Sequence, residues 1–172
     1  VNSVGTFTVQ DRNLGATRAD AGSGDEYKDS HGLLYQWGRK DPFKVDKFTY
    51  LTWKKSSSYS IEDVIKQPTS LSVAKGSYSS SANWTSQNII DLWSESSKTI
   101  YDPCPVGYRV ASFGAWTDFG DVSKFDNSYE YGLKVKYNES EYAWYAYTSY
   151  HEEWENRFNN TDGHIYIWSA DQ

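Results

Sequence analysis

Residues 101–110 read Tyr-Asp-Pro-Cys-Pro-Val-Gly-Tyr-Arg-Val, and they hold the single cysteine of the chain and two of its four prolines. Pro103 and Pro105 lack a backbone donor, and each pushes the residue before it into an extended conformation. Cys104 is therefore predicted to lie on a stiff, non-helical bend, which Gly107 relaxes before the next strand. Because one cysteine cannot form an internal disulfide, it is either a buried free thiol or the partner of a cysteine outside this sequence.

Length and composition favour one soluble domain over residues 1–172 that is rich in binding-type side chains. Aromatic residues make up 17% of the chain, and most of them are Tyr and Trp, which suit half-buried positions and binding surfaces. The net charge of −6 argues against nucleic acid, whose phosphates need a basic face. No apolar run approaches the length of a membrane span.

The pattern of short alternating segments predicts an α+β fold with small antiparallel sheets, one or two short helices and long irregular loops. Alternation or richness in β-forming residues predicts strands over 6–10, 108–111, 132–137, 141–147 and 164–169.

Helices and loops are predicted from caps, spacing and turn residues. Apolar residues at helical spacing predict a helix over 86–94, and the polar composition of 19–30 predicts an exposed loop. Residues 32–38 are apolar between glycines and fit either a short helix or a buried strand. Three further segments have their own predictions: a turn over 39–43, an irregular excursion over 54–82 with a short strand or helical turn, and a turn or short helix starting at Ser112 and running through 115–119.

The segment after the last aromatic strand is the best candidate for ligand binding. Tyr150 and Trp154 lead into a stretch rich in Glu and Asn that ends at Asn159 and Asp162. Aromatic faces stack on sugar rings, and neighbouring amides and carboxylates bond sugar hydroxyls. The alternative is a plain loop. For three other tryptophans, Trp37, Trp144 and Trp168, a core position is preferred over a binding role.

Four strings of this chain resemble the C-terminal domain of Bacteroidetes fimbrillin-family surface proteins, and they are also similar to the Fibrobacter succinogenes major paralogous domain. These strings are Asp11-Arg12-Asn13-Leu14-Gly15-Ala16, residues 32–43 (GLLYQWGRKDPF), residues 99–111 (TIYDPCPVGYRVA) and Tyr166-Ile167-Trp168-Ser169. Within them, the residues that carry the motif are Asp11, Arg12, Asn13, Trp37, Cys104, Arg109 and Trp168.

The resemblance implies a C-type lectin-like fold related to the formylglycine-generating enzyme, on secreted or lipid-anchored bacterial surface proteins and often at fimbria tips. It also implies further strands after Trp168, ending near a second cysteine that pairs with Cys104. The sequence stops at Gln172, so we expect the last C-terminal strands to be missing from it, with a naturally short form as the alternative.

Metal and catalytic chemistry are not expected. The calcium motifs of lectins are absent, and the acidic loop with Asp20, Asp25, Glu26 and Asp29, like the turn at Asn159, Asn160 and Asp162, fits hydrophilic turns better than a Ca²⁺ site. Cys104 lies between prolines with no histidine nearby in sequence. The related enzymes use a pair of reactive cysteines, which this chain cannot supply. No catalytic residue, metal ligand or cofactor is therefore predicted.

The expected function is that of an extracellular cell-surface binding or adhesion module. Its ligand would be a host or dietary glycan or a surface protein, and neighbouring fimbrial subunits are further partners. The alternative is a structural module that caps a fimbria and accepts a strand from the next subunit. An enzyme is the least favoured class.

Overall fold

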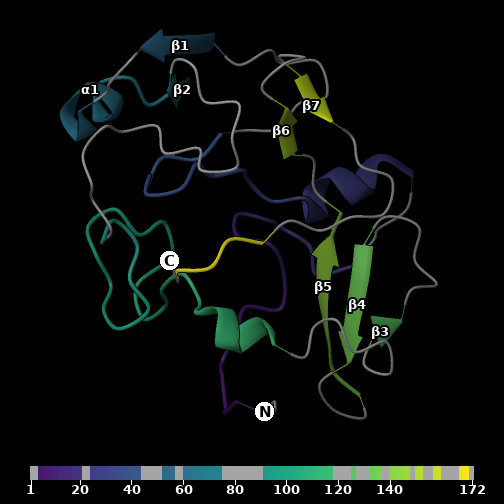
Figure 1. Cartoon of the computed structure of the whole chain (residues 1–172). Helices are drawn as coiled ribbons and strands as arrows, with labels where there is room; N and C mark the ends of the chain where they lie inside the picture. The colour runs from purple at the N-terminus through teal and green to yellow at the C-terminus, as the bar shows by residue number, and fades with distance from the viewer. Residues whose placement is uncertain are drawn as a thin grey trace. The chain divides into compact units, whose positions relative to one another are not determined.

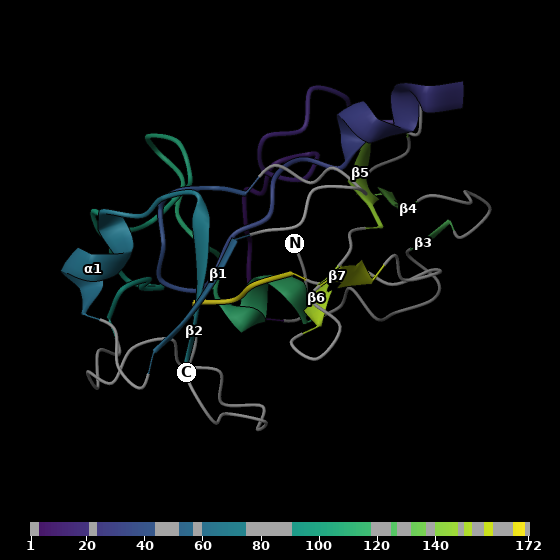
Figure 2. The same ribbon diagram turned by 90° about the horizontal axis from the view of Figure 1, so that it is seen from above.

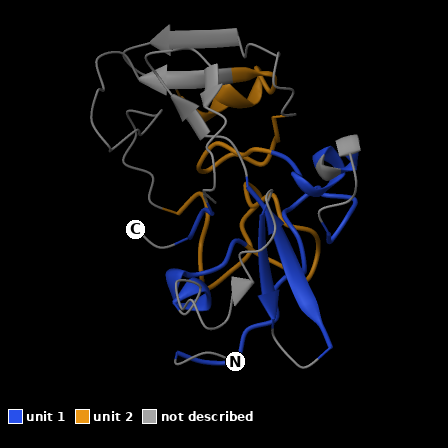
Figure 3. Cartoon of the chain, turned by 90° about the vertical axis from the view of Figure 1, so that its right-hand side faces the viewer, with its two compact units in different colours: residues 1–33, 110–171 blue, residues 34–109, 172 orange. Residues whose placement is uncertain are grey.

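A computed structural model describes residues 4–20, 24–43, 52–56, 60–74, 91–117, 125–126, 132–136, 140–147, 150–152, 157–159 and 167–170 (Figure 1). The chain divides into two compact units (Figure 3). Unit 1 comprises residues 1–33 and 110–171, and unit 2 comprises residues 34–109 and 172. One domain over 1–172 with a C-type lectin-like fold stays a prediction.

Unit 2 contains a small strand–helix–strand element (Figures 1 and 2). Strand β1 (Thr52–Ser56) pairs in parallel with β2 (Ser70–Ala74), and helix α1 (Ile61–Ile65) lies between them in the chain. Two parallel strands need a crossover connection, which is usually helical. The prediction of a short strand or helical turn within 54–82 is confirmed. Only antiparallel sheets were predicted, so the parallel pairing of β1 with β2 was not predicted.

A capping box starts helix α1. The Ser60 hydroxyl accepts a hydrogen bond from the Asp63 backbone N–H (3.1 Å), and the Asp63 carboxylate accepts one from the Ser60 N–H (3.1 Å). These bonds from Ser60 lower the pKa of Asp63. A helix this short forms because its first turn is capped and its apolar face is packed.

The core of unit 2 forms where α1 meets the segment after residue 90. Val64 and Leu92 are buried together, and half-buried Trp37, Ile61 and Tyr101 pack against them. Gly38 has a φ of 74°, and a Cβ there would run into the Leu92 side chain. Glycine at 38 therefore serves both the left-handed backbone and the close approach of the core.

Unit 1 contains two antiparallel sheets. Strands β3 (Phe125–Asp126), β4 (Gly132–Lys136) and β5 (Tyr142–Ala146) form one, and β6 (Tyr150–Glu152) pairs with β7 (Arg157–Asn159) in the other. β4 and β5 confirm the strands predicted over 132–137 and 141–147. Figure 1 shows them side by side.

Three predicted strands are wrong within the described residues. Residues 6–10 join no ladder: the Tyr145 hydroxyl donates to the Gln10 carbonyl (2.6 Å), but backbone pairing with β5 begins only at residues 11 and 12. Residues 108–111 and 167–169 are also not strands. A backbone bond from Ala170 N to the Ala111 carbonyl (2.9 Å) joins the residue after 167–169 to the end of 108–111, and the described residues show no ladder there.

Two predicted helix and loop assignments are also wrong. Residues 91–94 of the predicted helix over 86–94 are irregular, with a bend at 92 and 93, and residues 86–90 lie outside the described residues. The Leu92 carbonyl accepts from Thr99 Oγ1, and Trp93 Nε1 donates to the Tyr101 carbonyl. The predicted loop over 19–30 contains the 3₁₀ helix η1 (Gly24–Ser30). Its Asp29 carbonyl accepts from Thr17 N (2.8 Å), which ties the helix to the chain before it.

Residues 32–43 reverse the chain direction, and a short helix follows Ser112. Residues 32–38 are neither helix nor strand: Leu34 forms an isolated bridge with Phe43, so the chain reverses between them, as the turn over 39–43 predicts. The short helix predicted after Ser112 is the 3₁₀ helix η2 (Phe113–Trp116). No helix in the described parts of the chain is long and apolar enough to cross a membrane.

Candidate ligand-binding surface

A buried carboxylate holds the bend around Cys104. The Asp102 side chain is fully buried, and its Oδ1 accepts from Lys98 Nζ (2.9 Å) and from the Cys104 backbone N–H (2.8 Å). Lys98 Nζ also donates to the Cys104 carbonyl (2.6 Å). Both backbone groups of Cys104 are thus held by charged side chains, which fixes the bend predicted from the flanking prolines.

The surroundings of Cys104 make its thiol a poor nucleophile. Burial, followed by the nearby Asp102 carboxylate, raises the pKa of Cys104 to about 12. Because the thiolate is the nucleophile, a thiol with this pKa stays protonated and unreactive at neutral pH. The bonds at this cluster therefore favour a structural role for the 101–110 stretch.

We predict that native Cys104 reacts slowly with iodoacetamide at about pH 8, at least tenfold more slowly than in the unfolded chain, whose thiol has a pKa of about 8.5. The native rate should keep rising as the pH approaches 12. Stability should follow the same difference, because the unfolded thiol loses its proton before the native one does. The free energy of unfolding therefore falls as pH rises from about 9 towards 12, more steeply than in Cys104→Ser. Equal native and unfolded labelling rates at pH 8 would contradict this account of the thiol.

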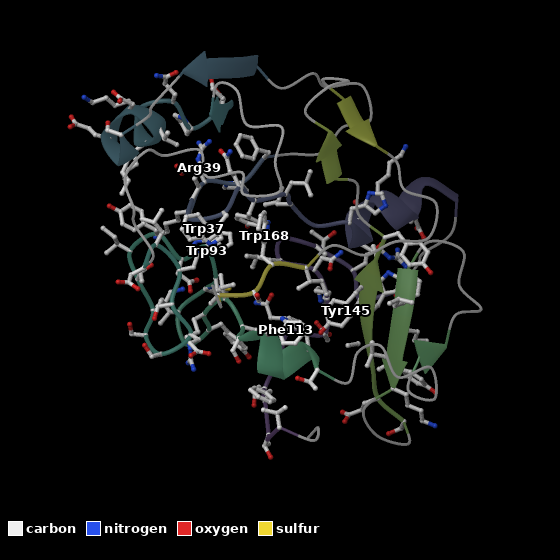
Figure 4. The ribbon with its side chains drawn as sticks, viewed as in Figure 1. Trp37, Arg39, Trp93, Phe113, Tyr145 and Trp168 are labelled. Carbon is white, nitrogen blue, oxygen red and sulfur yellow. The ribbon has the colours of Figure 1, made fainter. Side chains whose placement is uncertain are left out.

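Arg39 is the central clamp of unit 2 (Figure 4). Its guanidinium is buried and donates to the carbonyls of Ser70 (2.7 Å), Pro68 (3.1 Å) and Gln67 (3.3 Å). It also bonds the Gln36 side chain (3.1 Å), and burial lowers its pKa. Arg39 therefore holds the turn between α1 and β2, and we assign it a structural role.

The Asp11-Arg12-Asn13 motif fastens the N-terminal segment to β5. Arg12 Nε and Nη2 donate to the Asp11 carboxylate (2.7 and 2.9 Å), which lowers the pKa of Asp11. The Asp11 carbonyl accepts from Trp144 N (2.7 Å). Asn13 Nδ2 donates to the carbonyls of His31 and Ala146 (both 3.1 Å). The three residues of the motif therefore help to hold the backbone of unit 1 in place.

The other motif residues have different surroundings. Trp37 packs on the core of unit 2, and Trp144 is 2% exposed in the core of unit 1, so the preferred core positions of these two are confirmed. Trp168 is 50% exposed, so its predicted core position is wrong. The segment that carries it joins no ladder that would turn its side chain inward. Arg109 is exposed and its Nε donates to the Glu95 carbonyl (2.5 Å).

Three aromatic side chains are exposed in the described parts of unit 1. Phe113 on η2 is 66% exposed and Trp168 is 50% exposed (Figure 4), and Tyr142 on β5 is 37% exposed. Sequence reasoning missed Phe113 because it begins a four-residue 3₁₀ helix, which is too short for a periodic pattern to mark a face. Half-exposed aromatics of this kind are typical of binding surfaces.

Two of the four predicted ligand-binding residues are brought together. Tyr150 on β6 and Asn159 on β7 are register partners, although eight residues separate them in the chain. Trp154 and Asp162 lie outside the described residues; along the chain, Trp154 belongs to the segment connecting β6 to β7. The pairing supports treating this hairpin as one candidate site.

A cationic and aromatic group lies on β4 and β5 and was not predicted from the sequence. Lys134 Nζ lies 4.0 Å from the centroid of the Tyr142 ring, and Lys136 Nζ lies 5.9 Å from it. Lys136 is the register partner of Tyr142. The alternation Lys-Val-Lys in 134–136 was the available signal, because it places both lysines on one face of the strand.

Two carboxylates of the acidic loop are paired with an arginine. Arg18 pairs with Asp20 (2.7 Å) and Glu26 (3.1 Å). Among the described residues, no cluster of three His, Cys, Asp or Glu side chains is arranged to hold a metal ion. Asp29, another residue of that predicted loop, uses its backbone carbonyl to bond Thr17 N.

Comparison with protein-family models, with curated proteins and with solved structures found no match to this chain.

Proposed function

We propose that this chain is a cell-surface adhesion module that captures a glycan on the β6–β7 hairpin. The observation that carries the proposal is the register pairing of Tyr150 with Asn159, which gathers two candidate ligand-binding residues at one position of a two-stranded sheet. The proposal adds Trp154 and Asp162, which the sequence predicted as ligand-binding residues. In such a site aromatic rings stack on sugar C–H faces, and amides and carboxylates bond sugar hydroxyls. The fimbrillin-type resemblance of the four sequence strings supports an extracellular setting.

Charged side chains that could take part in catalysis are engaged in hydrogen bonds within the fold, and this supports a binding role over a catalytic one. Asp102 and Lys98 are engaged with each other and with the Cys104 backbone, and Arg39 is engaged with backbone carbonyls. Groups held in this way position loops and have little freedom to act on a substrate.

The glycan proposal predicts a loss of binding in Trp154→Ala. On a glycan array, the wild-type chain should bind a defined group of structures, and Trp154→Ala should weaken that binding about tenfold or more, the effect of losing one stacking aromatic side chain. Trp168→Ala, which removes an exposed tryptophan outside the hairpin, is the matched control and should bind like the wild type. Equal binding by wild type and Trp154→Ala would contradict the proposed site.

A structural module of a fimbria is the second candidate. The observation that favours it is that residues 167–170 form no strand, while Ile167 is 40% exposed and Trp168 is 50% exposed. A strand from a neighbouring subunit that paired with this segment would cover both side chains. Absence of array binding by the folded chain, together with stable pairing to a purified neighbour subunit, would favour this function.

A further inference from the structure

We infer that residues 6–9 form an open strand edge that pairs antiparallel with the same residues of a second copy of this chain. The inference goes beyond the proposed glycan capture and does not depend on it. Three properties of the segment carry it: an extended conformation held at both ends, a backbone without hydrogen bonds in the described structure, and surroundings without net charge.

Exposure along this segment has the period of a β-strand. Among residues 4–8, Val4, Thr6 and Thr8 are exposed, whereas the two residues between them are half-buried. Successive side chains of a strand point to opposite faces, so this alternation indicates an extended backbone. The threonine, phenylalanine and valine of residues 6–9 are also residue types that strands favour.

Both ends of the segment are held by the rest of unit 1. A Cβ at Gly114 on η2 would lie 3.2 Å from Val4 Cγ1 and 3.9 Å from Phe7 Cζ, so the start of the segment lies against this helix. At its other end, the Gln10 carbonyl accepts from the Tyr145 hydroxyl of β5 (2.6 Å). The edge is therefore fixed in place before a partner arrives, which reduces the entropy that pairing costs.

The backbone between these two attachments is open. Within the described structure, residues 6–9 form no hydrogen bond, and backbone pairing with β5 begins only at Asp11, whose carbonyl accepts from Trp144 N (2.7 Å). Consecutive unpaired N–H and C=O groups on an extended segment are a template for another strand. Because an extended main chain can bond several of these groups at once, the partner that fits this edge is a β-strand.

Charge favours a second copy as the source of that strand. Residues 1–10 contain no charged side chain and no proline, whereas the whole chain has a net charge of −6. Two copies therefore repel each other over most of their surface but can meet along this segment without like charges. Asp11 and Arg12, the first charged residues, pair with each other (2.7 Å), so the flank of the edge is neutral as well. The lysine or proline with which many proteins guard an exposed edge is absent from this part of the sequence.

Cross-strand pairing selects the register of the dimer. A two-fold axis brings the same edge of both copies together in antiparallel orientation. When Thr8 lies opposite the partner's Thr8, each Phe7 lies opposite the partner's Val9. Aromatic side chains paired with β-branched ones, and threonine paired with threonine, stabilise neighbouring strands. A shift by one residue would instead place Phe7 opposite a threonine or a glutamine and lose these pairs.

The first test measures self-association of the whole chain by sedimentation equilibrium. The paired edge spans about five residues per copy, far less than the roughly 800 Å² per partner of a stable complex, so the Kd should be on the order of 100 μM. Thr8→Lys places two like charges directly opposite each other and should raise this Kd at least tenfold. Thr69→Lys, the same change at an exposed threonine of unit 2, is the matched control and should leave the Kd unchanged.

The second test reads the register by disulfide cross-linking in a Cys104→Ser chain. Thr8→Cys should form an intermolecular disulfide, because residues opposite each other in a ladder have Cα atoms about 4.5–5.5 Å apart. Thr6→Cys should cross-link at least tenfold more slowly, because the two copies of residue 6 lie about 14 Å apart along the ladder. Thr6 and Thr8 are both exposed, and each variant is first checked for a wild-type melting curve.

Three results would overturn the inference: a monomer at about 1 mM chain, an unchanged Kd in Thr8→Lys, or equal cross-linking of Thr6→Cys and Thr8→Cys. Because neither test contains a glycan, the dimer and the proposed capture of carbohydrate are decided separately.

Discussion

Arg39→Met should lower the free energy of unfolding by about 3 kcal/mol or more. The substitution keeps much of the side-chain volume but removes every donor that the buried guanidinium gives to the carbonyls of Ser70, Pro68 and Gln67. Buried acceptors left without a donor cost about 1–3 kcal/mol each before relaxation. Urea unfolding followed by tryptophan fluorescence measures the change.

Two further variants separate the contribution of the several Arg39 hydrogen-bond donors from that of its positive charge. Arg39→Lys keeps the charge but offers a single donor centre, so it should still lose more than half of the effect. Arg109→Met is the matched control, because Arg109 also donates to a backbone carbonyl but is exposed, and its loss should cost at most about 1 kcal/mol. Equal losses for Arg39→Met and Arg109→Met would show that Arg39 is not the clamp of unit 2.

Asp102→Ala should lower the free energy of unfolding by about 2–3 kcal/mol, because it removes the buried acceptor of two hydrogen bonds while the Lys98 side chain of the pair is 34% exposed. The carboxylate accepts from Lys98 Nζ and from Cys104 N, and its removal leaves both donors without this acceptor. Asp102→Asn retains an oxygen that can accept from Cys104 N and should therefore cost less. Thermal and urea unfolding of the three proteins measure the series.

Glu62→Ala is a well-matched control for the buried pair. Glu62 and Lys66 share the four-residue spacing of Asp102 and Lys98, with an even shorter separation of 2.6 Å. Both of their side chains are exposed, so this pair should contribute less than about 1 kcal/mol. A loss in Glu62→Ala as large as that in Asp102→Ala would mean that burial of Asp102 does not set its contribution.

The sequence predicted those parts of the fold in which local pattern and tertiary pairing agree. Strands β4 and β5 alternate clearly and pair with each other, so their positions were predictable. The segments over 6–10 and 108–111 have the same local preference, but the partner strands that a ladder needs are absent beside them in the described structure. Intrinsic β-propensity does not reveal whether such a partner exists.

The structural roles of the motif residues were only partly predictable. Flanking prolines predicted the bend at Cys104, but the burial of Asp102 and its bonds to Lys98 depend on contacts that no spacing rule reveals. The exposure of Trp168 was mispredicted because a tryptophan in a β-like string is normally assigned to the core. The lysine pair around Tyr142 needed the register of β4 against β5, which the sequence leaves open.

The most direct test of the whole account is a glycan array probed with the folded wild-type chain. The account predicts selective binding to a small set of glycans, which Trp154→Ala weakens. A correctly folded chain that binds no glycan on the array would contradict the central proposal that this chain captures carbohydrate.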